Sequence, residues 1–249
     1  MIFKYKFLKK SLIDGDFSIE NIDFKDIQKV STYWIAAQER INLFNDGAIF
    51  LKTHNGLCKL ENNFFTNKNN TKAAIYVVRD PRNVITSLSH HYDMSLEESF
   101  NFLTDKNIGL INRKIDSSVV TTIGDWSNNY KSWRNLKFSP LLIVKYEDLI
   151  TDVKKTFLSI LNFLKDFMDI KIEENRILKT IESCSFDRLA KNEEIKGFNE
   201  SVYSAKKDKK LKFFYLGKKN NWKKLVKKEI INKINNRFKN EMKELGYLI

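Results

Sequence analysis

The chain is poor in cysteine, and this excludes the two structural roles that cysteine most often has. Of its 249 residues only Cys58 and Cys184 are cysteines, and they lie far apart and form no C-x-x-C pair. We therefore expect neither a disulfide framework nor a zinc site. We expect no bound metal, and the absence of a disulfide pattern is typical of a cytoplasmic protein.

Long apolar runs and flexible segments are also missing. No run of eighteen apolar residues occurs, so no membrane span is expected, and the start MIFKYKFLKK has too short an apolar stretch for a signal peptide. Eight glycines and two prolines leave little room for linkers, and there is no internal repeat. We expect a single domain over residues 1–249, without a membrane partner.

Positive charge is in excess, since 44 Lys and Arg residues stand against 31 Asp and Glu residues and give a net charge of +13. Such a chain suits either an anionic nucleotide or a nucleic acid. The lysines are spread along the sequence, and the aromatic residues fall at core positions and do not alternate with a basic stripe. We therefore expect no nucleic-acid partner, although a nucleic-acid binder stays the third hypothesis.

The stretch from Ala73 to Tyr92 is the centre of the chain. Ala73 to Val78 is short, apolar and rich in β-branched residues, which predicts a strand buried on both faces. The charged turn that follows contains Asp80, which can cap a helix, and Pro81, which suits a first helical turn. The pattern predicts a strand, a tight basic turn and a helix.

This arrangement suits an anion such as a phosphate. The helix start offers free backbone N–H groups, Arg79 ends the strand, and Thr86 and Ser87 supply hydroxyls one turn into the helix. The alternative is an ordinary strand-turn-helix with a solvated arginine.

Residues Arg79-Asp80-Pro81-Arg82-Asn83-Val84, followed by Ser87, resemble the 3′-phosphate-binding segment of the sulfotransferases that use 3′-phosphoadenylyl sulfate (PAPS) as donor. The resemblance implies that Arg79 and Ser87 hold the 3′-phosphate of the nucleotide.

A second candidate segment, Lys52-Thr53-His54-Asn55-Gly56, follows a predicted buried strand at Ala48 to Leu51. A histidine at the carboxyl end of a strand in an open α/β sheet can act as a general base, and Lys52 would point to the same side. A surface Lys-Thr-His without chemistry is the alternative. The same tripeptide occurs in the sulfotransferase family upstream of the arginine motif. The resemblance implies that His54 is the catalytic base and that Lys52 neighbours the transferred group.

Two further segments resemble the family in the same order. Tyr146 starts a Tyr-Glu-Asp that ends a predicted strand at Leu141 to Lys145, and the resemblance implies that its ring lies at the adenine end of the donor. Phe186 ends Cys184-Ser185-Phe186, which corresponds to a Thr-Ser-Phe beside the nucleotide, with Cys184 in place of the threonine.

The last matching segment departs most from the family. Gly217 and Trp222 keep the spacing of its Arg-Lys-Gly and Gly-Asp-Trp motifs, of which the first closes over the 3′-phosphate. Tyr215 and Leu216 stand where the arginine and lysine are expected. Lys218, with Lys219 beside it, is expected to substitute as a point charge without the bidentate fork of arginine.

Helical periodicity marks several other elements, whose apolar stripes are expected to be core. The final helix carries a lysine-rich face that we interpret as solvated. A histidine is common in bacterial relatives where Asn129 stands, so no catalytic role is assigned to Asn129. The predicted helices are Asp26 to Asn42, one opened by a Ser95 and Glu98 capping box, one carrying Trp126 and Trp133 in the core, Val153 to Leu164, Ile172 to Ser183, and Leu225 to Leu245; the predicted loops are Glu61 to Lys72 and Lys106 to Ser118.

The most diagnostic family motif, a Lys-Ser-Gly-containing loop that cradles the 5′-phosphosulfate, is absent between Met1 and Lys52. No Walker A sequence occurs either, which argues against a kinase. The sequence therefore predicts an α/β fold that is truncated at its N-terminus, and little sulfuryl transfer by the chain as it stands.

The sequence thus predicts a three-layer α/β fold with a mostly parallel central sheet and helices on both faces, like the P-loop-like fold of the sulfotransferases. The resemblance implies transfer of a sulfuryl group from PAPS to a hydroxyl or amine of a small-molecule or glycan acceptor. The alternative is a non-catalytic remnant that binds a nucleotide or a partner without turnover.

Overall fold

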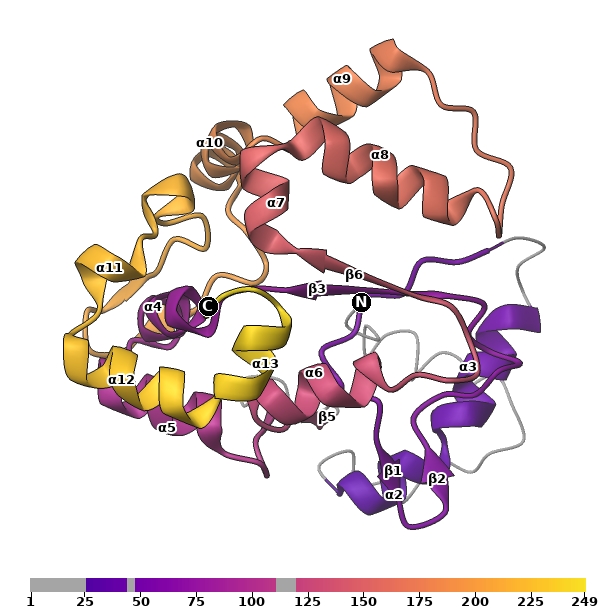
Figure 1. Cartoon of the computed structure of the whole chain (residues 1–249), viewed down its shortest axis with the longest axis horizontal. Helices are drawn as coiled ribbons and strands as arrows, with labels where there is room; N and C mark the ends of the chain where they lie inside the picture. Colours follow the sequence, from indigo (N-terminus) through magenta and orange to yellow (C-terminus); the bar gives the residue numbers. More distant parts are fainter. Residues whose placement is uncertain (1–25, 44–47, 111–119) are drawn as a thin grey trace. The chain divides into compact units, whose positions relative to one another are not determined.

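The computed structural model describes residues 26–43, 48–110 and 120–249 (Figure 1). The chain divides into two compact units, which are described separately below. The first unit is Met1–Tyr76 with Asp105–Leu142, and the second is Val77–Thr104 with Ile143–Ile249. Residues 111–118 of the predicted loop at Lys106 to Ser118 lie outside the described residues.

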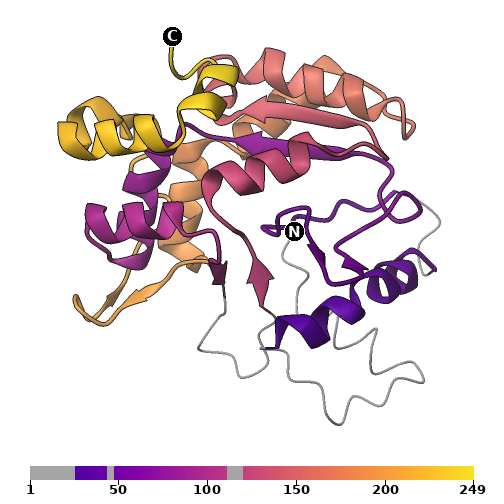
Figure 2. The ribbon, with the colours of Figure 1, turned by 60° about the horizontal axis from the view of Figure 1, so that its bottom comes forward.

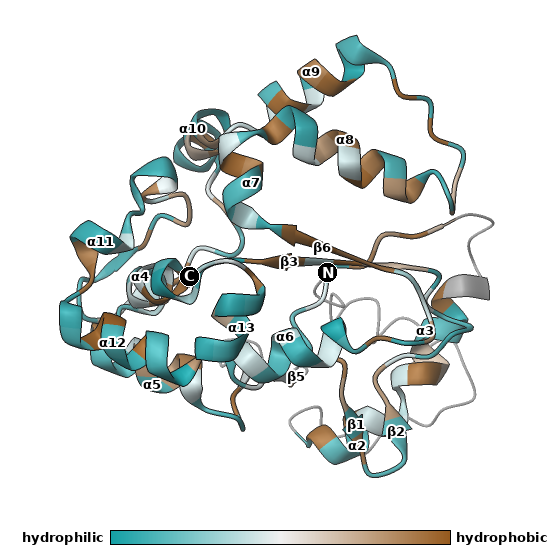
Figure 3. Cartoon of the chain, in the orientation of Figure 1, coloured by the Kyte–Doolittle hydropathy of each residue, from teal (hydrophilic) through white to brown (hydrophobic). Residues whose placement is uncertain are grey.

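Two paired strands, β3 (Ala74–Val78) and β6 (Leu141–Lys145), form the central sheet of the described residues. Their arrows point the same way in Figures 1 and 2, so the pair is parallel. Both strands are apolar and β-branched, and they stand out as hydrophobic segments in Figure 3. The α/β class and the positions of these two predicted strands are confirmed. The predicted burial of β3 on both faces is wrong, because Val77 is 53% exposed and Val78 is its only fully buried residue.

The first unit is built around one aromatic cluster. Its buried members are Val30, Trp34, Phe65, Trp133 and Leu136. The ring of Phe65 meets those of Trp34 and Trp133 edge-on, at centroid distances of 5.4 and 6.3 Å. Trp133 is thus core, as predicted, whereas Trp126 is half-buried. The elements of this unit are α2 (Ile27–Thr32), α3 (Trp34–Leu43), β1 (Lys59–Leu60) paired with β2 (Asn63–Phe64), β4 (Gly109–Leu110) paired with β5 (Thr121–Thr122), and α6 (Trp126–Arg134).

The helix predicted from Asp26 to Asn42 is interrupted at Tyr33, so α2 and α3 are separate helices. Asp26 caps α2, because its carboxylate accepts from the backbone N–H groups of Gln28 and Lys29. At the other end the hydroxyls of Ser31 and Thr32 donate to carbonyls three residues back, at 2.7 Å each. Such local bonds compete with helical ones and favour a break.

The strand predicted at Ala48 to Leu51 is wrong. These residues are irregular, and Phe50 and Leu51 are 58% and 40% exposed. A strand needs a hydrogen-bonded neighbour, and no strand of the described residues pairs with this segment. The loop predicted from Glu61 is also partly wrong, because Asn63–Phe64 is strand β2.

The second unit is mainly helical. Helix α4 packs against α5, α11 and α12, while α8 packs against α7 and α9. The predicted capping box opens α5, since Ser95 and Glu98 exchange hydrogen bonds of 2.7 and 3.1 Å. The elements are α4 (Pro81–Tyr92), α5 (Leu96–Thr104), α7 (Tyr146–Thr151), α8 (Val153–Leu164), α9 (Glu174–Ser183), α10 (Phe186–Lys196), β7 (Tyr203–Ser204) paired with β8 (Lys209–Lys210), a 3₁₀ turn (Gly217–Lys219), α11 (Trp222–Leu225), α12 (Lys228–Arg237) and α13 (Lys239–Glu244).

The final helix predicted from Leu225 to Leu245 is split in three. Val226 has an extended backbone and Phe238 leaves the helical region, so α11, α12 and α13 are separate. The predicted core stripe nevertheless holds, because Ile230, Ile234 and Phe238 are at most 2% exposed. By contrast, no residue of α8 is fully buried, so its predicted core stripe is wrong in part: Val153 is exposed and the remaining stripe residues are half-buried. None of the described helices has the length and apolar character that a membrane span requires.

Candidate functional site: an anion pocket in the second unit

The second unit contains an open pocket of about 170 Å³ that gathers most of the residues expected to bind nucleotide. Arg79, Tyr146, Gly217 and Lys218 all line it. They come from the end of β3, the start of α7 and the 3₁₀ turn. The full lining is Arg79, Asn83, Tyr146, Glu147, Ile150, Thr151, Gly217, Lys218 and Asn220.

Arg79 is held in place by Ser87 and Tyr146, both of which the resemblance also assigns to nucleotide binding. Its Nη1 donates to the hydroxyl of Ser87 at 3.2 Å, and its guanidinium carbon lies 4.4 Å from the centre of the Tyr146 ring. Burial lowers the pKa of this guanidinium, while Tyr146, Glu147 and Asp80 oppose the shift. Because arginine stays charged at neutral pH, the pocket keeps a fixed cation beside a hydroxyl and a flat ring.

The sequence predicted free backbone N–H groups at the start of α4, and the structure shows that these groups already have partners. The carboxylate of Asp80 accepts from the N–H of Arg82 at 2.9 Å, and the carbonyl of Asp80 accepts from the N–H groups of Asn83 and Val84. The helix start is therefore already satisfied by Asp80. An anion here would be bound by side chains and not by the first amides of α4.

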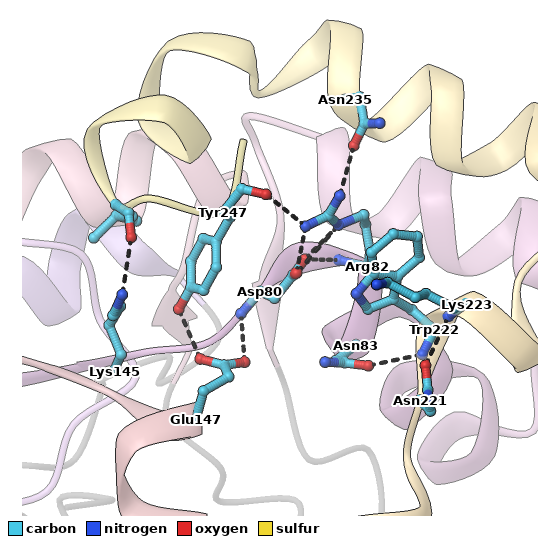
Figure 4. A network of polar contacts seen from close by, with 11 residues as sticks. Asp80, Arg82, Asn83, Lys145, Glu147, Asn221, Trp222, Lys223, Asn235 and Tyr247 are labelled. Carbon is cyan, nitrogen blue, oxygen red and sulfur yellow. Dashed lines mark hydrogen bonds and ion pairs between the residues drawn. The ribbon is translucent and has the colours of Figure 1, made fainter. Parts of the chain in front are cut away.

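Arg82 belongs to the same turn but has a structural role (Figure 4). It is 6% exposed and donates to the Asp80 carboxylate through Nε and Nη2, with the shortest contact at 2.7 Å. Nη2 also donates to the carbonyl of Tyr247, and the guanidinium carbon lies 3.9 Å from the centre of the Trp222 ring. Arg82 is thus fully engaged in holding α4 to the C-terminal segment, and the pocket does not use it.

Glu147 places a carboxylate at the pocket wall, and both of its oxygens have partners (Figure 4). Oε1 accepts from the N–H of Asp80 at 3.1 Å, and Oε2 accepts from the Tyr247 hydroxyl at 2.8 Å. Burial and the nearby Glu147 raise the pKa of Tyr247, so that its hydroxyl stays protonated and donates. The carboxylate therefore fixes the turn between β3 and α4.

Residues 213–222, which we call the strap, close one side of the pocket through Asn220. The Asn220 amide nitrogen donates to the Ser87 hydroxyl at 3.1 Å and to the Asn83 carbonyl at 3.2 Å. Its amide oxygen accepts from the Thr86 hydroxyl at 2.6 Å. Asn220 stands where the Gly-Asp-Trp motif of the resemblance has a glycine, but this departure does not by itself indicate a role for the asparagine. Sequence reasoning alone did not assign one.

Gly217 and Phe186 lie in direct contact inside the second unit. Gly217 has φ of +52°, and a Cβ added there would lie 2.9 Å from three atoms of the Phe186 ring. Both the backbone angle and the contact require glycine. Phe186 opens α10, so the predicted residue beside the nucleotide packs on the turn that lines the pocket with Lys218.

The two predicted catalytic residues, His54 and Lys52, lie in the first unit and are exposed. The loop that carries them is anchored through Asn55, whose side-chain oxygen accepts from the N–H of Thr122 at 2.7 Å and whose carbonyl accepts from Trp133 Nε1 at 2.9 Å. The His54 side chain is thus presented to solvent from a fixed loop. The structure groups the six nucleotide-site predictions, Arg79, Ser87, Tyr146, Phe186, Gly217 and Lys218, in the second unit.

Asn129 has a role in the same loop that the sequence did not reveal. Its side-chain nitrogen donates to the carbonyl of His54 at 3.3 Å and to that of Ile123 at 2.9 Å, and its oxygen accepts from the Tyr76 hydroxyl at 3.0 Å. Asn129 therefore ties the backbone at His54 to β3 through Tyr76.

Comparison with known proteins relates this chain to the sulfotransferases. It is 28% identical over 154 residues to luciferin sulfotransferase from Photinus pyralis, covering 61% of this chain and 39% of that protein. It is 27% identical over 188 residues to amine sulfotransferase from Oryctolagus cuniculus, covering 71% of this chain and 56% of that protein. The chain thus spans roughly two to three fifths of the length of these relatives.

A solved structure with a similar fold is retinol dehydratase in a complex with retinol and PAP. It matches with a TM-score of 0.50 and 17% identity, over 71% of this chain and 49% of that chain. The sulfotransferase domain model matches residues 7–246. With nearly its whole length matched, this chain belongs to the sulfotransferase family.

Proposed function

We propose that this protein binds the PAPS donor of the family in the pocket of the second unit and transfers its sulfuryl group to a hydroxyl or amine. The observation that carries the proposal is the pocket that brings Arg79, Tyr146 and Lys218 together with the Arg79–Ser87 hydrogen bond. Two cations, a hydroxyl and an aromatic ring are what the 3′-phosphate and the adenine of such a nucleotide require.

The chain's own residues have separate roles in this proposal. Arg79 and Ser87 bind the 3′-phosphate, Tyr146 supports the adenine end, Phe186 lies beside the nucleotide, and Lys218 on the turn at Gly217 adds charge. The donor, when bound, supplies a sulfuryl group already activated by its anhydride bond to phosphate. His54 takes the proton from the acceptor hydroxyl or amine, and Lys52 stabilises charge at the transferred group.

The acceptor is proposed as a small molecule or glycan. The relatives are named for luciferin and for amines, which are small molecules. The exposure of His54 is compatible with an acceptor that approaches from solvent.

The first test is binding of adenosine 3′,5′-bisphosphate (PAP), the desulfated donor. At about 100 times its Kd, PAP stabilises the native state by about 2.7 kcal/mol. For a chain of this size that is a rise in Tm of roughly 5–10 °C. Arg79→Ala removes a charge-assisted contact worth about 1.5–3 kcal/mol and should abolish most of the rise, measured against the variant's own Tm without ligand.

The matched control is Arg188→Ala. Arg188 is an exposed arginine of α10 that forms a surface ion pair with Glu182 at 3.4 Å, so the PAP-dependent rise should be unchanged. An equal rise in the Arg79 variant would contradict the assignment of Arg79. Duplex DNA binding as tight as PAP binding at physiological salt would instead favour a nucleic-acid binder.

The second readout is transfer itself. Because little transfer is expected from the 249 residues alone, turnover is measured with PAPS and a panel of phenols, alcohols and amines after a segment containing a Lys-Ser-Gly loop has been added before Met1. In that protein His54→Ala should lower turnover by roughly 10²–10⁴-fold, the usual contribution of a general base, and leave the Kd for PAP unchanged. A protein with the added loop that binds PAP but transfers no sulfuryl group to any acceptor would favour the non-catalytic alternative.

A further inference from the structure

Glu193 is a buried carboxylate that the proposed function does not use. It lies in α10, is 8% exposed, and belongs to the second unit. Its Oε1 accepts from the N–H of Phe213 at 2.7 Å and from the Ser201 hydroxyl at 2.5 Å, and its Oε2 accepts from the N–H of Phe214 at 2.9 Å. A buried charge is costly unless it is hydrogen-bonded, and here three donors converge on it.

The protonation state of Glu193 follows from these partners. Burial raises the pKa of this carboxyl, but the bonds from Ser201, Phe213 and Phe214 outweigh that effect, so the pKa is lower than usual. Glu193 is therefore ionised at neutral pH and accepts all three hydrogen bonds. The neighbouring Glu194 differs, because it is exposed and forms a surface ion pair with Lys212 at 2.5 Å.

Two of the three donors belong to the start of the strap. Phe213 and Phe214 precede the pocket-lining Gly217 and Lys218 by a few residues, and Asn220 fixes the other end of the strap to α4. Between these anchors Gly217 packs on Phe186, which lies on the same helix as Glu193. The strap is thus held at both ends, and the segment that presents Lys218 lies between them.

We infer that Glu193 is a positioning residue for the nucleotide pocket, because it holds the strap by two backbone N–H groups in the position that presents Lys218 to the ligand. The inference rests on the proposed binding of the nucleotide in this pocket. Glu193 acts on the ligand only through the strap and does not touch it.

The test compares Glu193→Gln with the adjacent Glu194→Gln in the full chain. Glutamine has nearly the same size, but one of its two acceptor atoms becomes a donor, so one N–H of the strap faces another donor. The Kd for PAP, measured by calorimetry, should rise at least about tenfold for Glu193→Gln, which corresponds to the loss of a hydrogen bond to a charged group. It should stay within about twofold of wild type for Glu194→Gln, a surface pair.

A double-mutant cycle with Lys218→Ala separates positioning from a general loss of stability. If Glu193 acts through the strap, Glu193→Gln should weaken PAP binding far less in the Lys218→Ala background than in wild type, because the contact it supports is already missing. Equal factors in both backgrounds would overturn the inference. If the glutamine variant does not fold, Glu193→Asp replaces it. This substitution keeps the charge but moves the carboxylate away by one methylene, so it should weaken PAP binding in wild type and far less in the Lys218→Ala background.

Failure of the proposed function and failure of this inference give different experimental results. A wild-type chain that does not bind PAP overturns the proposed function and this inference with it. A wild-type chain that binds PAP, with Glu193→Gln and Glu193→Asp binding equally well, overturns the inference alone.

Discussion

At the scale of single residues, the contact between Gly217 and Phe186 gives the sharpest prediction. Gly217→Ala adds a methyl group 2.9 Å from the Phe186 ring at a backbone φ of +52°. Gly246→Ala is the matched control, since Gly246 also has positive φ but its added Cβ would meet only the end of Lys145 at 3.9 Å. The control should cost about 1 kcal/mol of unfolding free energy from the backbone alone.

Gly217→Ala should lower the free energy of unfolding by about 1–3 kcal/mol more than Gly246→Ala does, because the ring of Phe186 must move, as at other overpacked sites. Urea unfolding measures both variants. Equal losses would show that the Phe186 ring yields freely and that the contact does not define the pocket wall.

The residues of the candidate site that could be proposed from the sequence are those whose chemical type points to anion or ring binding. Arg79, Ser87 and Tyr146 stand in a recognisable order, and the structure groups them. The roles of Asn220 and Glu193 could not be predicted, because each forms hydrogen bonds with residues that are distant in the sequence. An amide or a carboxylate in a polar segment is ordinarily a surface residue.

At the scale of elements, the largest loss of stability is expected from a substitution at the start of α4. Asp80 is both the cap of this helix and the carboxylate partner of the buried Arg82. Asp80→Asn keeps the capping oxygen but leaves a buried guanidinium without its counter-charge. Breaking a buried ion pair in this way should cost about 3 kcal/mol or more of unfolding free energy.

Asp152→Asn is the control for that substitution. Asp152 caps α8 by accepting from the N–H of Lys155 at 3.2 Å, and it is exposed. Asparagine caps about as well as aspartate, so a change within about 0.5 kcal/mol is expected. Similar losses for the two variants in chemical unfolding would mean that Arg82 finds another partner or is solvated in solution.

Helix and strand positions could be predicted where they depend on residues that are close in the sequence. The strand before Arg79, the Asp80 cap and the Ser95 capping box all depend on neighbours in sequence, and all three are confirmed. The predicted strand at Ala48 to Leu51 failed because an apolar run cannot indicate whether a partner strand lies beside it. The split at Phe238 was missed because the apolar stripe continues on both sides of it.

At the scale of the whole molecule, we propose that the two units unfold as a single domain. Strands β3 and β6 each run from the first unit into the second, so neither unit can lose its part of the sheet independently. Differential scanning calorimetry should then give one transition, with equal calorimetric and van't Hoff enthalpies, and PAP should move all of it. Two transitions, of which PAP moves only one, would contradict the proposal.

The sequence has four tryptophans, and three of them, Trp34, Trp126 and Trp133, fall in the first unit. Trp222 ends the strap, its N–H is held by Asn83 at 3.0 Å, and the Arg82 guanidinium lies over its ring. A cation at that distance perturbs the emission of an indole, so Trp222 is an intrinsic optical reporter of the strap. A change in its emission on addition of PAP would therefore report a change at the strap without any added dye.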